Sequence, residues 1–133
     1  MAVLMTISEP FWLLFAGWAS AGARRDDPVL GRLIASYRNA WERGDREDRY
    51  AVIELVQRAS LTEGSDLIID GLGSEDERLA IHAAAHALAL LERGFSFASG
   101  SGVRGALVEF GRRHPGSRAL SDAALSRLDT ARR

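Results

Sequence analysis

The sequence contains neither cysteine nor lysine, and these absences narrow the range of functions. Without cysteine, the chain can form no disulfide framework, no thiolate metal site and no cysteine nucleophile. All 17 basic residues are arginine, a usage typical of a GC-rich genome, which favours a bacterial source. A net charge of −1 gives no reason to expect a polyanion or a membrane surface as the partner.

Motifs of common enzyme classes are also missing. The segments GLGSED and SGSGVRG lack the preceding strand and the lysine of a phosphate-binding loop, and no serine lies in a G-x-S-x-G turn. Paired carboxylates are numerous, but each group lies at a predicted helix start, where capping accounts for it. No segment alternates polar and apolar residues between hairpin turns, so we expect no strand. The sequence therefore indicates an all-α protein that is not an enzyme and needs no cofactor.

The segment FWLLFAGWASAGA near the N-terminus is unusually aromatic. It has the apolar character of a signal peptide, but no basic residue precedes it and Glu9 and Pro10 interrupt the run, so we expect a cytoplasmic protein. We predict a helix with Ser8 as its N-cap and Pro10 in its first turn. Its aromatic residues either cap the core or form an exposed patch for a partner subunit, including a second copy of the chain. These residues are Phe11, Trp12, Phe15 and Trp18.

The region from Ser65 to Gly94 predicts two helices joined by a very short turn. Ser65 is placed to cap the first helix, which ends at Gly73. Ser74 and the glutamate three residues later form an S-x-x-E capping box for the second helix. That helix is rich in alanine and leucine and ends at Gly94, a glycine in the usual C′ position.

Comparable signals predict the remaining helices. Asp27 followed by Pro28 begins a helix that Gly44 ends, and Asp45 caps the next one, which extends to about residue 60. Further helices are expected over 103–113 and after Ser117. The chain is thus expected to be a single domain over 1–133, with an aromatic capping helix within 1–27 and three helical hairpins over 28–131.

The hairpins recur at nearly constant spacing, opening at Pro28, Asp66 and Gly102, which are 38 and 36 residues apart. A period in this range is typical of stacked helix pairs, since no pair can bury its apolar face alone. The segment LIIDGLGSEDERLAIHAAAHALALLERG resembles a HEAT repeat, with an acid in the turn and an A-L-x-x-L motif in the second helix. The resemblance covers 28–131 and implies a short α-solenoid of antiparallel hairpins. A compact orthogonal bundle is the alternative.

The function that fits this fold is binding to another protein, as an adaptor, an immunity protein or an antitoxin. We expect the partner to bind the inner face formed by the second helices of the hairpins, with the aromatic helix and the acidic residues around the central turn as contact edges. The acidic residues are Asp70, Glu75, Asp76 and Glu77. A homodimer through the four aromatic residues is compatible with this function.

Two alternatives depend on other side chains. His82 and His86 are four residues apart, so they share a helix face and would hold a metal if His114, Asp70 or Glu54 supplied a third ligand. The pair lacks the glutamate of H-E-x-x-H, and half-buried structural histidines are the simpler interpretation.

The second alternative is a nucleic-acid interface near the C-terminus. From Arg93 onward there are eight arginines and three acids, and backbone contacts through them would depend steeply on salt. Arginines solvated near helix ends are the simpler interpretation. The candidate residues are Arg104, Arg112, Arg113, Arg118 and Arg127.

Overall fold

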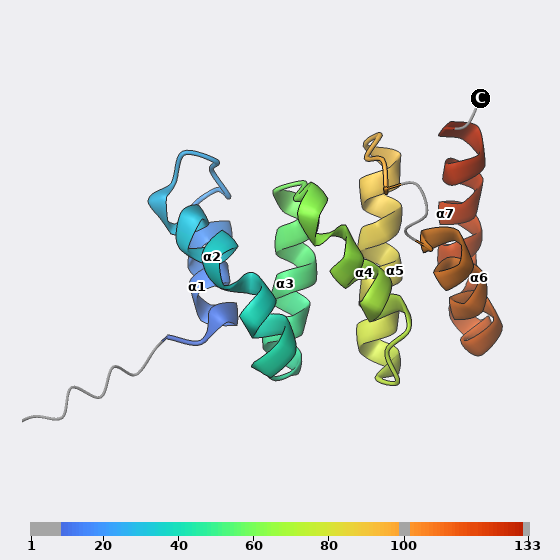
Figure 1. Cartoon of the computed structure of the whole chain (residues 1–133), viewed down its shortest axis with the longest axis horizontal. Helices are drawn as coiled ribbons and strands as arrows, with labels where there is room; N and C mark the ends of the chain where they lie inside the picture. The colour runs from blue at the N-terminus through green and yellow to red at the C-terminus, as the bar shows by residue number, and fades with distance from the viewer. Residues whose placement is uncertain (1–8, 99–101, 132–133) are drawn as a thin grey trace, which may run out of the picture. The chain divides into compact units, whose positions relative to one another are not determined.

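The computed structural model describes residues 9–98 and 102–131, and these residues contain seven α-helices, two short 3-10 helices and no strand. The prediction of an all-α fold with about seven helices is confirmed. The residues pack mainly within two compact units, Met1–Val52 and Ile53–Arg133. The boundary between the units falls inside helix α3 (Arg46–Arg58), which is labelled in Figure 1. The expectation of a single domain stays a prediction.

Unit 1 is built on the packing of α1 (Phe11–Ser20) against α2 (Pro28–Arg43). Pro10 is the N-cap of α1 and does not lie in its first turn as predicted, while Ser8, the expected cap, lies outside the described residues. Because proline offers no side-chain acceptor, the cap comes from elsewhere in the unit. The Trp12 backbone N–H donates to Asp48 Oδ1 at 3.0 Å, so the start of α3 holds the start of α1.

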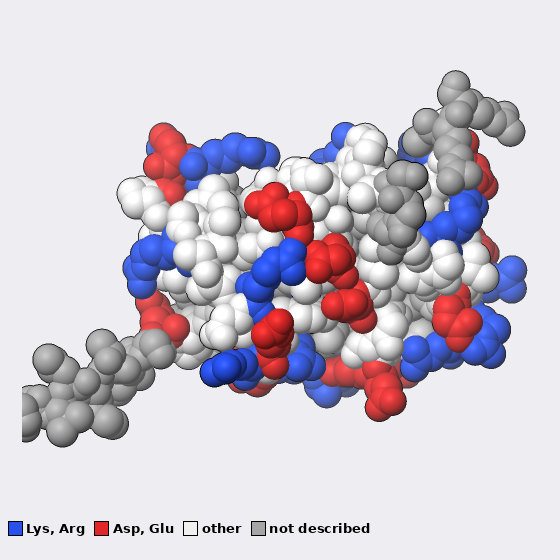
Figure 2. All heavy atoms as spheres, in the orientation of Figure 1, with Lys and Arg blue, Asp and Glu red and all other residues white. Residues whose placement is uncertain are grey.

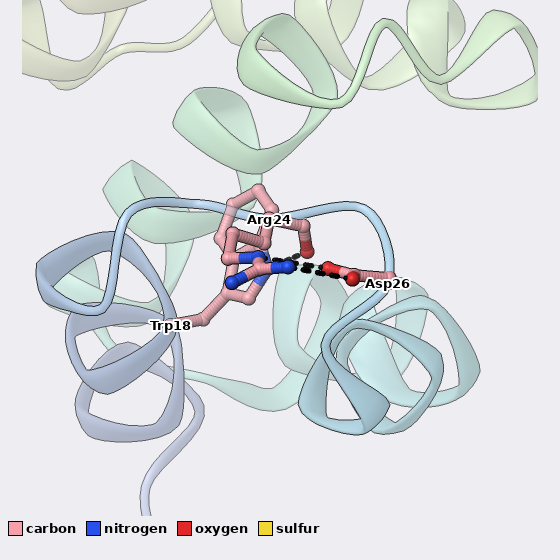
Figure 3. Close-up of polar contacts among 3 residues, drawn as sticks. All are labelled: Trp18, Arg24 and Asp26. Atoms are coloured by element: carbon pink, nitrogen blue, oxygen red, sulfur yellow. Dashed lines mark hydrogen bonds and ion pairs between the residues drawn. The ribbon is translucent and has the colours of Figure 1, made fainter.

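The loop between α1 and α2 is held by the side chain of Trp18 (Figure 3). The indole Nε1–H of this buried residue donates to the Arg24 carbonyl oxygen at 2.9 Å. The Arg24 guanidinium then donates twice to the Asp26 carboxylate, at 3.0 and 2.8 Å. At the end of α1, Gly22 has a φ of +105°, and the N–H of Ala23 donates to the Trp18 carbonyl at 3.0 Å. This turn at the end of α1 directs the chain towards α2, and the Trp18 indole remains buried beneath the loop.

The predicted boundaries of α2 and α3 are found in the structure. Asp27 Oδ1 accepts the Val29 N–H at 2.9 Å, with proline in the first turn, and Gly44 is the C-cap of α2. Asp45 Oδ1 accepts the Asp48 N–H at 3.1 Å, as expected of the cap of α3. These signals were predictable because each satisfies backbone groups within three residues of itself.

Unit 2 contains two helical hairpins after the end of α3. The first pairs α4 (Ser65–Leu72) with α5 (Glu77–Glu92), and the second pairs α6 (Val103–Arg113) with α7 (Arg118–Ala131). The short helices η1 (Thr62–Gly64) and η2 (Pro115–Ser117) precede α4 and α7. Helix α5 packs on α7 and α4 packs on α6, so the hairpins stack as two layers (Figure 1). This stacking is consistent with a helical-repeat arrangement.

Small residues allow this close stacking. Ala80, Ala83, Ala84 and Ala87 of α5 are completely buried. A Cβ at Gly111 of α6 would lie 2.8 Å from the Ser121 hydroxyl oxygen of α7, so the helices approach each other too closely there for a larger residue. The buried alanines of α5 are therefore explained by the close packing of this helix against its neighbours.

Two helix starts in unit 2 differ from the prediction. Ser65 is the first residue of α4 and caps nothing, since its hydroxyl donates to the Thr62 carbonyl at 3.0 Å inside η1. Helix α5 begins later than predicted, and its N-cap is Asp76, whose Oδ1 accepts the N–H groups of Arg78 and Leu79 at 3.1 and 3.4 Å. The capping box of Ser74 with Glu77 is therefore wrong.

The predicted end of α5 is confirmed. Gly94 follows the C-cap with a φ of +84°, and the N–H of Phe95 donates to the Leu90 carbonyl at 3.0 Å. A glycine at this position adopts the left-handed conformation without steric cost, which is why this signal is easy to read in a sequence.

Candidate functional site: contact surfaces and a histidine–glutamate cluster

Three of the four predicted contact residues of the aromatic helix are buried. Phe11, Phe15 and Trp18 are buried, with 8%, 7% and 1% of their surface exposed. Of the four aromatic residues predicted to bind a partner, only Trp12 is exposed, at 39%, beside Leu13 at 42%. The capping interpretation therefore accounts for the three buried residues, which lack the exposed surface that a partner would contact.

The acidic residues around the central turn are exposed. Residues 62–77 contain six acidic side chains and no basic one. Asp70, Glu75 and Glu77 are exposed, while Asp76 is half-buried because it caps α5. Acidic side chains gather over α4 in Figure 2.

Sequence reasoning missed two members of this surface, Glu63 and Asp66. Both are exposed and precede Asp70 by seven and four residues. The four-residue spacing of Asp66 and Asp70 places both on one face of α4 and was the available signal, while Glu63 lies in η1, directly before that helix. We call the exposed carboxylates of η1, α4, the following turn and the start of α5 the acidic surface; its members are Glu63, Asp66, Asp70, Glu75 and Glu77.

The candidate arginines of α6 and α7 lie beside acceptors. Arg127 lies 3.9 Å from a Glu92 carboxylate oxygen, and Arg113 donates to the Gly73 carbonyl at 3.3 Å. The other three pair with acids of their own hairpin, which are Asp129 for Arg104, Glu109 for Arg112 and Asp122 for Arg118. Four of the five positive charges are thus partly balanced by a neighbouring carboxylate, which weakens the field that would attract a phosphate backbone.

The most defined group of polar side chains in unit 2 joins the end of α3 to α5. His82 and His86 share one face of α5, and their ring centroids are 4.3 Å apart at an interplanar angle of 67°. From α3, Glu54 places its Oε1 3.7 Å from His82 Nε2. One nitrogen of each histidine and one carboxylate oxygen of Glu54 lie within 4.8 Å of one another, the spacing of a potential metal site. We call these three residues the His–Glu cluster.

Hydrogen bonds from α3 and α5 position the cluster. His86 Nδ1 lies 3.0 Å from Gln57 Oε1, one turn along α3 from Glu54. In the Nδ1–H tautomer the imidazole donates to this amide oxygen, which only accepts, and its lone pair lies on Nε2. At the end of α5, Arg93 donates to the backbone carbonyl of Gln57 and to the Ser60 hydroxyl. These hydrogen bonds join α3 and α5 on the side of the cluster nearest the C-terminal end of α3.

The surroundings of His86 favour its neutral form. Partial burial lowers the pKa of His86 from 6.5 to about 4, with smaller contributions from His82 and Arg58. The guanidinium of Arg58 also approaches Glu54, with 3.9 Å between Nε and Oε2. A neutral imidazole with a free lone pair is the form that binds a metal ion.

Of the three residues considered as a third ligand, the structure brings Glu54 to the histidines. His114 is the C-cap of α6, where its ring lies 5.0 Å from Phe110, and Asp70 lies on the exposed side of α4. Neither joins the His–Glu cluster. Sequence reasoning missed Gln57, because hydrogen bonding between helices leaves no local pattern.

Within the described part of the chain, no helix has both the length and the apolar character needed to span a bilayer. A comparison with protein-family models, curated proteins and solved structures found no match.

Proposed function

We propose that the chain is a non-catalytic interaction module of the HEAT-like type that binds a basic segment of another protein through its acidic surface. The observation that carries this proposal is the run of six acidic residues without a basic one over 62–77. These residues lie at the edge of stacked helical hairpins, an architecture that offers extended binding surfaces. An adaptor, immunity protein or antitoxin in a bacterial cytoplasm would suit this description.

Charge decides which kind of partner fits. Carboxylates at the edge of a surface attract basic side chains and accelerate association, while contacts between like charges are disfavoured. The acidic surface therefore favours a partner rich in lysine or arginine and disfavours a nucleic acid. The alternative of nucleic-acid binding through α6 and α7 has less support, since carboxylates lie beside four of its five arginines.

Reversing two charges of the acidic surface tests the proposal. Glu75→Arg with Glu77→Arg is the suitable variant, because both residues are exposed and the cap formed by Asp76 is left intact. A matched control is Glu42→Arg with Glu47→Arg, which makes the same change in net charge on exposed residues of unit 1. Like Glu77, Glu47 lies in the first turn of a helix, so the control includes the loss of a favourable interaction with the helix dipole.

The measurement is affinity purification from the native cell extract, followed by titration of each variant with the purified partner at several salt concentrations. We expect one protein to be retained by the wild type and the control, and its affinity for the acidic-surface variant to fall at least tenfold. Equal affinity for all three chains would refute the acidic surface as the binding site. Retention of nucleic acid alone, released by salt, would favour the arginines of α6 and α7.

A further inference from the structure

The His–Glu cluster has the composition and spacing of a metal site. Two imidazole nitrogens and one carboxylate oxygen are ligands that zinc and similar divalent transition metals accept. In a tetrahedral site with bonds of about 2.0–2.2 Å, neighbouring ligand atoms are about 3.3–3.6 Å apart. The 3.7 Å between His82 Nε2 and Glu54 Oε1 is close to this value and longer than an ordinary hydrogen bond. All three ligand atoms lie within 4.8 Å of one another. Side-chain rotations that move each atom by less than about 1 Å would therefore bring them to the spacing of a tetrahedral metal site.

The cluster also has two features that are common around metal ligands, a hydrogen-bond acceptor for a histidine and access to solvent. A metal-binding histidine usually donates its second ring N–H to an oxygen acceptor, which fixes the tautomer and the ring orientation. Gln57 provides this acceptor for His86. The side chains of His82 and Glu54 are 23% and 30% exposed, so an ion can reach the site and keep a coordination position for water.

We propose that Glu54, His82 and His86 bind one divalent transition-metal ion of the zinc type, with Gln57 orienting His86. The ion would link the end of α3 to the middle of α5. Arg58 is the opposing feature, since its guanidinium lies 3.9 Å from Glu54 and its charge repels a cation. This proposal is independent of the acidic surface.

Titration of the tag-free, metal-stripped protein with Zn²⁺ tests the proposal by calorimetry, with Co²⁺ absorption reporting the ligand geometry. We expect the wild type to bind one ion per chain and Glu54→Gln, which keeps the side-chain shape, to weaken binding more than tenfold. Gln57→Leu should weaken binding about 10–100-fold, the usual range for a residue that orients a ligand. His114→Gln, at the histidine outside the cluster, is the control and should bind as the wild type does.

Arg58→Gln separates a metal site from a structural histidine pair. Removing the opposing charge should tighten Zn²⁺ binding severalfold if the ion lies beside Glu54, whereas surface binding elsewhere would not change. Circular dichroism of each variant establishes that it is folded. Absence of stoichiometric binding by the wild type, or wild-type affinity in folded Glu54→Gln and His86→Gln variants, would overturn the proposal.

Discussion

At the scale of single residues, the imidazole of His86 links the fold to pH. Its pKa is about 4 in the folded chain because of partial burial and nearby positive charge, whereas it returns to about 6.5 on unfolding. Between these values the unfolded chain binds a proton that the folded chain does not. The free energy of unfolding contributed by His86 is therefore complete above pH 6.5 and is lost as the pH falls towards 4.

We expect this loss to be about 1–2 kcal/mol, after allowance for solvent screening of a partly exposed group. Urea unfolding at pH 7 and pH 5, in the presence of a chelator, measures it. The His86→Gln variant should lose less stability than the wild type over this range, because no proton binds at that position. An unchanged dependence in His86→Gln would contradict the assignment to His86.

At the scale of elements, local signals located most helix ends but misplaced the start of α5. Both Ser74 and Asp76 are good capping residues, and Ser74 has a glutamate at the capping-box position. In the structure, Ser74 accepts the Asp76 N–H at 3.0 Å, while Asp76 accepts the first N–H groups of the helix. Which of two capping residues only two positions apart caps the helix depends on how the turn from α4 is packed, and sequence alone does not contain that information.

Truncation of the two candidates distinguishes these arrangements. We expect Asp76→Ala to lower the free energy of unfolding by about 1 kcal/mol, the usual cost of losing an N-cap. Ser74→Ala should cost less, because it removes one hydrogen bond within the turn and leaves the helix capped. Chemical denaturation at neutral pH measures both, and a larger loss for Ser74→Ala would restore the predicted capping box.

At the scale of the whole molecule, the stack in unit 2 depends on how closely α5 approaches its neighbours. Ala84 is completely buried in α5, whereas the next residue, Ala85, is exposed. We expect Ala84→Leu to destabilise the protein by about 1–3 kcal/mol, since added methylenes in a filled core force the helices apart. Ala85→Leu makes the same chemical change on the exposed face and should be nearly neutral in thermal melting. Equal melting temperatures for the two variants would contradict the close packing of α5.

Periodicity and capping residues determined that this chain is helical and approximately where its helices lie, because these signals act over a few neighbouring residues. The sequence also showed that His82 and His86 share a face, since their spacing alone decides it. Only the tertiary structure decided that Glu54 and Gln57 lie beside these two histidines. It also decided that Phe11, Phe15 and Trp18 are buried. The same holds for the arginines of α6 and α7, which lie beside acceptors. Each of these outcomes depends on contacts between separate helices, which local spacing does not specify.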